Sequence, residues 1–386
     1  MQPVRITSLE NHNQLLYFTS SSILAGDDGI VYIGERKGQP NLFYTDLHTG
    51  KERQLTFNND GSLKSYVYFW GNEYRGFGKA SVSLHPESGN VYYIQGMNIC
   101  CVDIMGNHRI LAKLPDNQMT AFTHVSSDGT RLCVPTTDAR ALYYDTPQDT
   151  TTYSPNYNID KRIQDENLNS YIRVYDTTTG EEVLTERVPK SWITHVQFSP
   201  ADNNMILYNH EWPAADWGIR RMWIWDGQKH IRLREEGGER NREDIAVHEM
   251  WQRDGRDIIY HGIYKDQRPF IGKVKADGTD IVEIPLPETF TRYGHFTVSN
   301  SGLMVSDGYY RDDNDPDDPD AQWISIQSVD WDNRNIRWIP VCKCKWASNN
   351  QDSHPHPIFN HSDTAVYYTS SIEGNRAIYK ADVSFL

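Results

Sequence analysis

The chain has 386 residues, of which 38% are hydrophobic and 12% aromatic, and this composition suits a packed core and excludes an intrinsically disordered protein. A net charge of −14 disfavours nucleic acid and anionic membranes as partners. No stretch approaches the roughly 20 apolar residues of a membrane-spanning helix, and residues 1–7 lack the features of a signal peptide, so we expect a soluble cytoplasmic protein.

One pattern recurs seven times along the chain: an apolar residue, a turn rich in Asp, Gly or Pro, and a short apolar strand. Three loose copies centre on residues 27–29, 86–89 and 127–129, and four clear copies span residues 198–208, 251–260, 298–306 and 359–368. Each copy predicts a strand, a hairpin turn and a second strand. Third and fourth strands follow most copies, as in residues 42–56 and 172–185. Four short strands repeated seven times predict an all-β, seven-bladed β-propeller.

The two ends of the chain complement each other. The last copy stops after its third strand, at residues 377–382, and the strand-like residues 4–9 precede the first copy. We expect this N-terminal strand to close the last blade and remove an open sheet edge, so that residues 1–386 form one domain. Two segments lack the pattern, residues 147–170 and the acidic residues 311–320, and we expect both to be loops. The acidic run lacks the spacing of a calcium loop, so we expect a solvated loop there and not a metal site.

The five cysteines are few and odd in number, which favours a reducing compartment over a disulfide framework. Cys342 and Cys344 have the spacing of a strand. We therefore expect them to contribute to packing and not to redox chemistry.

Histidines recur at one position of the repeat. Three residues before the apolar residue of each copy, the last four copies carry a histidine: His195, His248, His295 and His356. Because the first strand of each propeller blade lines the channel, these side chains are predicted to form an arc at one mouth. The alternative is that the imidazoles only satisfy backbone groups around a wet channel.

A metal site is the more specific interpretation of this arc. The last copy adds Gln351 and His354 ahead of His356, and strand residues two apart share a face. Imidazoles with one amide oxygen suit a divalent first-row cation, with His295 of the neighbouring blade as the remaining ligand. Ligand type alone leaves manganese, iron, nickel and zinc open.

Further polar residues are expected at the same mouth. His210 and Glu211 follow the second strand of blade 4, and Arg221 opens its third strand. An arginine here suits a carboxylate ligand. The alternatives are a surface arginine and a His210–Glu211 pair that braces the loop.

These residues resemble the oligogalacturonate lyases of bacterial pectin breakdown over nearly the whole chain. The most specific motifs are Gln351-x-x-His354-Pro-His356-Pro, His248-Glu-Met-Trp251, His210-Glu-x-Pro213 followed by Arg221-Met-Trp223, and Gly294-His295. The sequence departs from the family pattern at Thr194, Val196 and Trp212, near the expected sugar site.

The resemblance implies a seven-bladed propeller with Mn²⁺ held by His295, His354, His356 and Gln351. It further implies His248 as general base and Arg221 as catalytic arginine. From their position at the same mouth, we expect His195, His210 and Arg221 to contact the substrate. The implied reaction is β-elimination of short oligogalacturonides to an unsaturated product.

Other functions stay open from the residues alone. One is a propeller that binds or senses a ligand without catalysis, because a fold does not imply a function. Another is a metal-dependent hydrolase, isomerase or lyase acting on a different oligouronide. Within the lyase hypothesis, His195 is the competing base.

Overall fold

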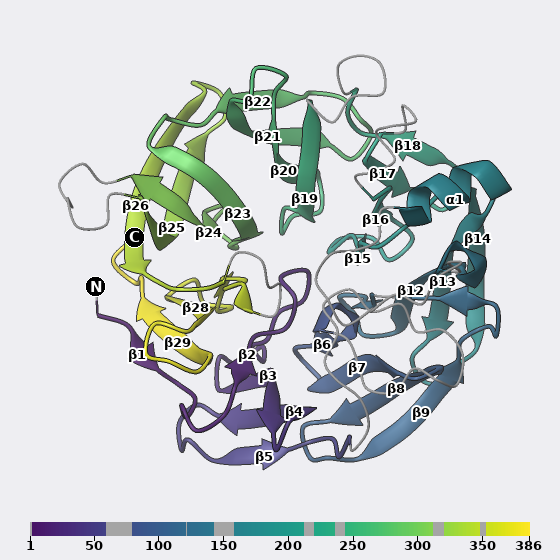
Figure 1. Ribbon diagram of the computed structural model, residues 1–386, viewed down its shortest axis with the longest axis horizontal. Coiled ribbons are helices and arrows are strands. Elements are labelled where there is room, and N and C mark those ends of the chain that lie inside the picture. The colour runs from purple at the N-terminus through teal and green to yellow at the C-terminus, as the bar shows by residue number, and fades with distance from the viewer. Residues whose placement is uncertain are drawn as a thin grey trace.

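Antiparallel sheets surround a central channel in the computed structural model, which confirms the all-β, seven-bladed propeller (Figure 1). The structure describes residues 2–58, 79–120, 122–142, 158–211, 220–235, 244–311, 320–347 and 353–386. In each blade the first strand is the innermost, so residues at its start lie at one mouth of the channel. The arc histidines lie just before the inner strand in blades 4 and 7 and within it in blades 5 and 6.

The first four blades take their strands in chain order. Blade 1 contains β2 (Asn13–Gln14), β3 (Gly29–Arg36), β4 (Gln39–Asp46) and β5 (Glu52–Gln54). Blade 2 contains β6 (Ser83–His85), β7 (Asn90–Gln95), β8 (Asn98–Asp103) and β9 (His108–Lys113), after a 3₁₀ turn at Lys79–Ser81. Blade 3 contains β10 (Gln118–Met119), β11 (His124–Val125), β12 (Arg131–Asp138), β13 (Asn169–Asp176) and β14 (Glu182–Pro189), with a 3₁₀ turn at Ala139–Leu142. Blade 4 contains β15 (Val196–Phe198), β16 (Ile206–Asn209), β17 (Met222–Trp225) and β18 (His230–Arg232).

The remaining blades follow the same order. Blade 5 contains β19 (Ile245–Trp251), β20 (Asp257–Ile263), β21 (Pro269–Lys275) and β22 (Val282–Pro285). Blade 6 contains β23 (Phe290–Val298), β24 (Met304–Arg311), β25 (Asp320–Asp330) and β26 (Asn335–Lys343). Blade 7 contains β27 (Ile358–Phe359), β28 (Ala365–Ser370) and β29 (Ala377–Asp382), and its outer strand is β1 (Val4–Arg5).

The N-terminal strand completes the last blade, as predicted. Val4 pairs with Lys380 and Arg5 with Tyr379 in the antiparallel β1–β29 ladder. The ladder continues through a hydrogen bond from the Ile6 amide to the Ile378 carbonyl (2.8 Å). This pairing covers the edge of β29 that the missing fourth strand would leave open.

The inner strand of blade 1 is interrupted, which the sequence did not predict. β2 pairs with β3, and the chain rejoins β3 only at the Ile23–Ile30 bridge. The intervening turn reaches the centre of the propeller (Figure 1). At its tip, Tyr17 and Phe18 are 3% and 1% exposed and pack with Phe122 and Trp192. We call Tyr17 and Phe18 the channel plug.

Part of one expected loop is helical. Helix α1 spans Asn158–Glu166, inside the segment 147–170 that we expected to lack regular structure. Ile163 is fully buried in the cluster that contains the channel plug, and Arg162 forms an ion pair with Glu166 one turn later. The prediction was wrong because so short and polar a helix gains its stability from tertiary packing, which periodicity does not reveal. Most of the acidic run, residues 312–319, lies outside the described residues.

The five cysteines are all free and buried, in agreement with the packing role expected for Cys342 and Cys344. Within the described ranges, no helix is long and apolar enough to cross a membrane.

Candidate functional site

The histidine arc is a contiguous group in the structure. His195 directly precedes β15, His248 lies in β19, His295 lies in β23, and His356 precedes β27. The ring centroids of His248 and His295 are 4.3 Å apart, as are those of His295 and His356. The equivalence of these positions along the repeat therefore places their side chains together at one level of the channel.

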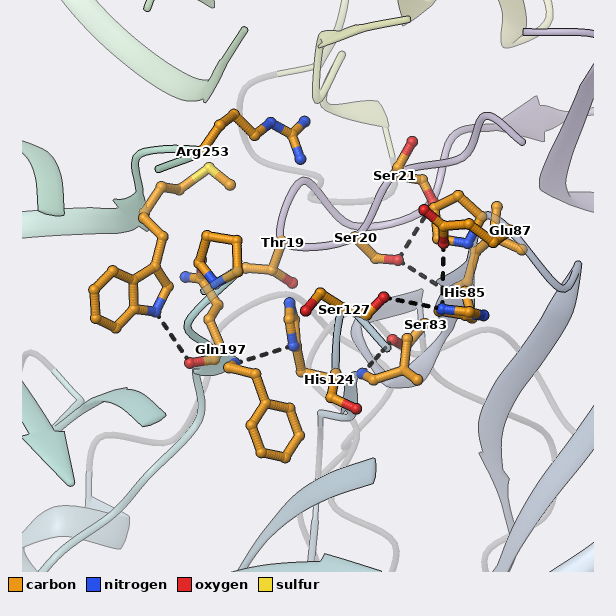
Figure 2. Close-up of a pocket in the computed structure, with 18 of the residues that line it drawn as sticks. Thr19, Ser20, Ser21, Ser83, His85, Glu87, His124, Ser127, Gln197 and Arg253 are labelled. Atoms are coloured by element: carbon orange, nitrogen blue, oxygen red, sulfur yellow. Dashed lines mark hydrogen bonds and ion pairs between the residues drawn. The ribbon is translucent and has the colours of Figure 1, made fainter. Parts of the chain in front are cut away.

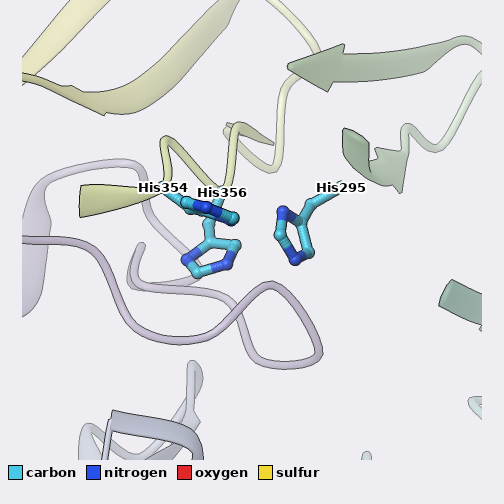
Figure 3. Close-up of side chains that lie close together, drawn as sticks. All are labelled: His295, His354 and His356. Atoms are coloured by element: carbon cyan, nitrogen blue, oxygen red, sulfur yellow. The ribbon is translucent and has the colours of Figure 1, made fainter. Parts of the chain in front are cut away.

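Two histidines of this group, His295 and His356, form a candidate metal centre together with His354. Nitrogen atoms of His295, His354 and His356, one from each ring, all lie within 4.8 Å of one another (Figure 3). We expected His354 and His356 to share one face of a strand, and this explanation was wrong. Both residues precede β27, and His356 has a positive φ of 44°. A left-handed residue between two prolines, and not strand alternation, brings the two imidazoles together.

The donor set fits a divalent cation. Nε2 of His295 is buried and has no hydrogen-bond partner among the described residues. An unpaired buried nitrogen is costly, and coordination to a cation removes that cost. Neutral imidazoles suit divalent first-row ions. Gln351, the predicted fourth ligand, lies outside the described residues.

Bulges direct the histidines of blades 5 and 6 into the channel. The β19–β20 register shifts between Val247 and Met250, and His248 has a positive φ of 52°. The β23–β24 register shifts in the same way around His295. Such bulges re-aim side chains next to functional sites. In blade 5 the bulge also buries Glu249 completely, although it follows His248 directly.

Arg221 lies in a buried charge cluster. Its Nε donates to Oε2 of Glu249 (2.9 Å) and its Nη1 donates to Oε1 of Glu211 (3.3 Å). Burial alone would raise the pKa of Glu249, but Arg221 and then His195 lower it to about 2. The carboxylates of Glu249 and Glu211 therefore face the guanidinium of Arg221 from two sides. Nη2 also lies 3.2 Å from Nδ1 of His195, but an Nδ1–H that donates to Glu249 cannot accept from Arg221 as well. At least two of the five guanidinium N–H groups are therefore without a partner among the described residues.

Thr194, one of the departures from the family pattern, supports this cluster. Its hydroxyl donates to Oε2 of Glu211 (2.5 Å) and accepts from the amide of Asn209 (3.0 Å). A residue without a side-chain hydroxyl at this position would supply neither contact. Trp212 lies outside the described residues.

His195 and His248 differ in how many of their ring nitrogens are engaged. Nδ1 of His195 lies 3.2 Å from Glu249, and its Nε2 lies 3.2 Å from the Tyr17 hydroxyl. Nδ1 of His248 lies 2.8 Å from Nε2 of His261, whereas its own Nε2 has no partner among the described residues. His248 therefore has a free ring nitrogen that His195 lacks.

Electrostatics keep His248 neutral. Burial lowers its pKa well below the usual 6.5, and the neighbouring His295 and His261 lower it further. Burial and His295 also lower the pKa of His261, to about 3. Both rings are uncharged near neutral pH, so one donates and the other accepts in the bond that joins them.

His210 and Glu211, which we expected to act at the same mouth, have different neighbours. The ring of His210 lies between Tyr208 and Trp223, with centroid separations of 6.0 and 5.7 Å. Burial, followed by His230, lowers its pKa to about 3. Glu211 instead contacts Arg221 and Thr194. Of the two residues, Glu211 therefore belongs to the charge cluster, whereas His210 packs between aromatic rings.

The channel plug supports the arc from inside. The Tyr17 ring lies 5.0 Å from that of His356, and the Phe18 ring lies 5.4 Å from that of His248 and 5.2 Å from that of His295. The repeat did not predict this contact, because the plug precedes its first copy. Glu249 and His261 were not predicted either, although alignment of the second strands would place His261 next to His248.

A cavity of about 240 Å³ opens at the other ends of the inner strands (Figure 2). Its lining includes Thr19, His124, Gln197 and Arg253. Thr19 directly follows the channel plug, whose rings contact the arc histidines, and no arc histidine lines the cavity. The metal-type cluster found in the described part of the chain lies on the histidine side.

Fold and site together define a β-propeller with a candidate histidine metal centre at one channel mouth. The sequence matches the family model described as oligogalacturonate lyase over residues 4–384. The chain therefore belongs to the oligogalacturonate lyase family, as its motifs implied.

Individual relatives agree with this assignment. An oligogalacturonide lyase from Pectobacterium atrosepticum is 27% identical over 230 residues, which is 55% of each chain, so the match spans about half of that relative's length. An oligogalacturonate lyase from Dickeya dadantii is 23% identical over 385 residues, covering 95% of this chain and 89% of that protein.

Two solved structures share the fold. An oligogalacturonate lyase in complex with manganese aligns with a TM-score of 0.73 at 20% identity, covering 99% of this chain and 93% of that one. An oligogalacturonate lyase from Vibrio parahaemolyticus aligns with a TM-score of 0.74 at 22% identity, covering 98% and 93%.

Proposed function

We propose that this protein is a Mn²⁺-dependent oligogalacturonate lyase that acts on short oligogalacturonides. The observation that carries the proposal is the position of His248. Its ring lies 4.3 Å from that of the candidate ligand His295, and its Nε2 is free among the described residues. His295, His354 and His356 would hold the cation with Gln351 as fourth ligand.

The reaction is a β-elimination at a 4-linked uronate. A base removes the proton at C5, the C4–O bond breaks, a C4–C5 double bond forms, and the leaving oxygen takes up a proton. The cation, when bound, withdraws charge from the uronate carboxylate and so acidifies the C5 proton.

His248 is the proposed base. With Nδ1–H donated to His261, the lone pair of Nε2 is free to accept the C5 proton. Burial makes His248 a weak base, because it lowers the pKa of the imidazole. The substrate proton must therefore be acidified first, which explains why base and cation site adjoin. His195 is the poorer candidate, since both its ring nitrogens contact protein groups.

Arg221 is the proposed partner of the substrate carboxylate. Its two remaining N–H groups are available, while Glu249 and Glu211 fix the guanidinium plane. We propose that His195 contacts the bound sugar. His210 is given no substrate contact, because its ring packs against Tyr208 and Trp223.

We also propose that residues 1–386 form one domain in the cytoplasm. The β1–β29 ladder, which joins the two ends of the chain, supports one domain. Five free cysteines suit a reducing compartment. The net charge of −14 disfavours nucleic acid and membrane surfaces as partners.

The test is turnover of digalacturonate and trigalacturonate by protein loaded with Mn²⁺, followed by ultraviolet absorbance of the conjugated product. Chelator-treated protein is the control and should be inactive until Mn²⁺ is restored. Reducing ends that accumulate without absorbance would point to a hydrolase. Binding of the oligomers without any product would point to a sensor.

A further inference from the structure

In three blades, the second strand places a polar side chain against the arc histidine of the first. The side-chain oxygen Oδ1 of Asn209 accepts a hydrogen bond from the backbone N–H of His195 (2.8 Å). His261 contacts the ring of His248, and Asp307 contacts His295. The three blades thus use an amide, an imidazole and a carboxylate. Of these three counterparts, only the carboxylate faces a candidate metal ligand.

Asp307 contacts His295 through both carboxylate oxygens. Oδ1 accepts the His295 amide N–H (2.8 Å), and Oδ2 lies 3.5 Å from Nδ1 of the ring. Both side chains are 3% exposed. Oδ2 of Asp307 and Nδ1 of His295 are both buried and have no hydrogen-bond partner of ordinary length among the described residues. Buried polar atoms require a partner, and each of these two has the other as a facing polar atom at 3.5 Å.

Gly294 makes this approach possible. A Cβ at residue 294 would lie 1.7 Å from Oδ1 of Asp307, far inside van der Waals contact. Only glycine therefore lets the carboxylate reach the backbone N–H of the next residue. Gly294 therefore allows Asp307 to contact both the backbone and the ring of His295.

We propose that Asp307 is a positioning residue that holds His295 in the tautomer required for metal binding. The Asp307 carboxylate can only accept a hydrogen bond, so it selects the form of His295 with the proton on Nδ1. The lone pair then resides on Nε2, the buried nitrogen without a partner. This inference rests on the proposed metal site.

The decisive comparison is between Asp307→Asn and Asp307→Ala, with Mn²⁺ affinity measured by chelator competition. Asparagine keeps the size of the side chain, and its carbonyl can still accept the His295 amide N–H. Its NH₂ group then faces Nδ1 and favours the wrong tautomer, which carries a proton on Nε2. We expect both variants to bind Mn²⁺ about 10- to 100-fold more weakly than wild type, with asparagine no better than alanine.

A purely structural role predicts the opposite order, because asparagine would restore packing. A loss below about fivefold in Asp307→Asn overturns the proposal. Asp138→Asn is the matched control, since Asp138 also accepts a backbone N–H from its blade (2.8 Å, from Asn169) but contacts no arc histidine. A wild-type protein that takes up no Mn²⁺ would overturn the metal site itself.

A second measurement uses the wild-type chain and does not depend on the variants folding. ¹⁵N-histidine NMR with Zn²⁺ as a diamagnetic substitute reports which ring nitrogen of His295 carries the proton. The resonance is assigned by its loss in His295→Gln. Protonation at Nδ1 supports the proposal, and protonation at Nε2 overturns it.

Discussion

Nδ1 of His248 and Nε2 of His261 lie 2.8 Å apart, so the two buried imidazoles share one hydrogen bond. For Nε2 of His248 to accept the C5 proton, His248 must donate through Nδ1 and His261 must accept. His261→Leu removes this acceptor, and we expect kcat to fall about 10- to 100-fold. His261→Gln retains an acceptor and should lose less. Steady-state kinetics of the two variants at equal Mn²⁺ content measures the difference.

His248 and His195 are separated by parallel alanine variants. His248→Ala keeps every proposed metal ligand, so it should retain Mn²⁺ and lose turnover by about 100- to 10,000-fold, the range for a removed general base. His195→Ala should lose less turnover, because it removes a ring whose nitrogens are both engaged. Near-normal kcat in His248→Ala, with the larger loss in His195→Ala, would transfer the role of base to His195.

Removal of a proposed metal ligand should separate binding from folding. His356→Ala deletes one of the three converging imidazoles. Mn²⁺ affinity should therefore fall by more than the 10- to 100-fold typical of losing a residue that only hydrogen-bonds to a metal ligand. The circular dichroism spectrum should stay that of wild type, because His356 precedes β27 and belongs to no strand of the propeller. Elemental analysis after dialysis provides the measurement. Full Mn²⁺ occupancy in His356→Ala would contradict the assignment, and His210→Ala is the control histidine.

The sequence predicted the blade order and the histidine arc because both follow from one repeat. In a propeller, equivalent residues of successive blades lie at one level, so alignment alone placed His195, His248 and His295 together. The expectation failed where the chain leaves the repeat. The turn that carries Tyr17 and Phe18 into the channel has no equivalent in the other copies.

Glu249 shows a second limit of the sequence. In a regular strand, Glu249 would face away from His248, on the opposite side of the sheet. The bulge at positive φ places both residues at the channel, and no pattern of alternation reveals a bulge in advance. His354 and His356 were grouped correctly for a reason that the structure replaces, because their convergence depends on a left-handed backbone.

The N-terminal strand should be essential for stability. Deletion of residues 1–9 removes the β1–β29 ladder and exposes the edge of β29. We expect a lower Tm and aggregation, since an open edge recruits other chains. Light scattering during a thermal melt measures both effects. Deletion of the exposed residues 384–386 is the control at the other end of the chain, and a Tm unchanged by the first deletion would refute closure by this strand.

Glu249 should link stability to pH. Its carboxyl has a pKa of about 2 in the folded protein against a usual value of 4.5, because Arg221 and His195 outweigh the effect of burial. A carboxyl whose pKa is lowered on folding stabilises the protein above its unfolded pKa, and this contribution is lost as the pH falls from 4.5 towards 2. A shift of this size corresponds to about 3 kcal/mol.

Glu249→Gln should therefore unfold at lower denaturant concentration than wild type at pH 7, by about 3 kcal/mol in the free energy of unfolding. The difference should shrink as the pH falls below 4.5, because wild type then loses the contribution that the variant already lacks. Urea titrations of both proteins between pH 7 and pH 3 provide the measurement. The exposed Glu181→Gln is the matched control and should follow wild type throughout. A difference that stays constant with pH would mean that Glu249 acts through packing and not through its charge.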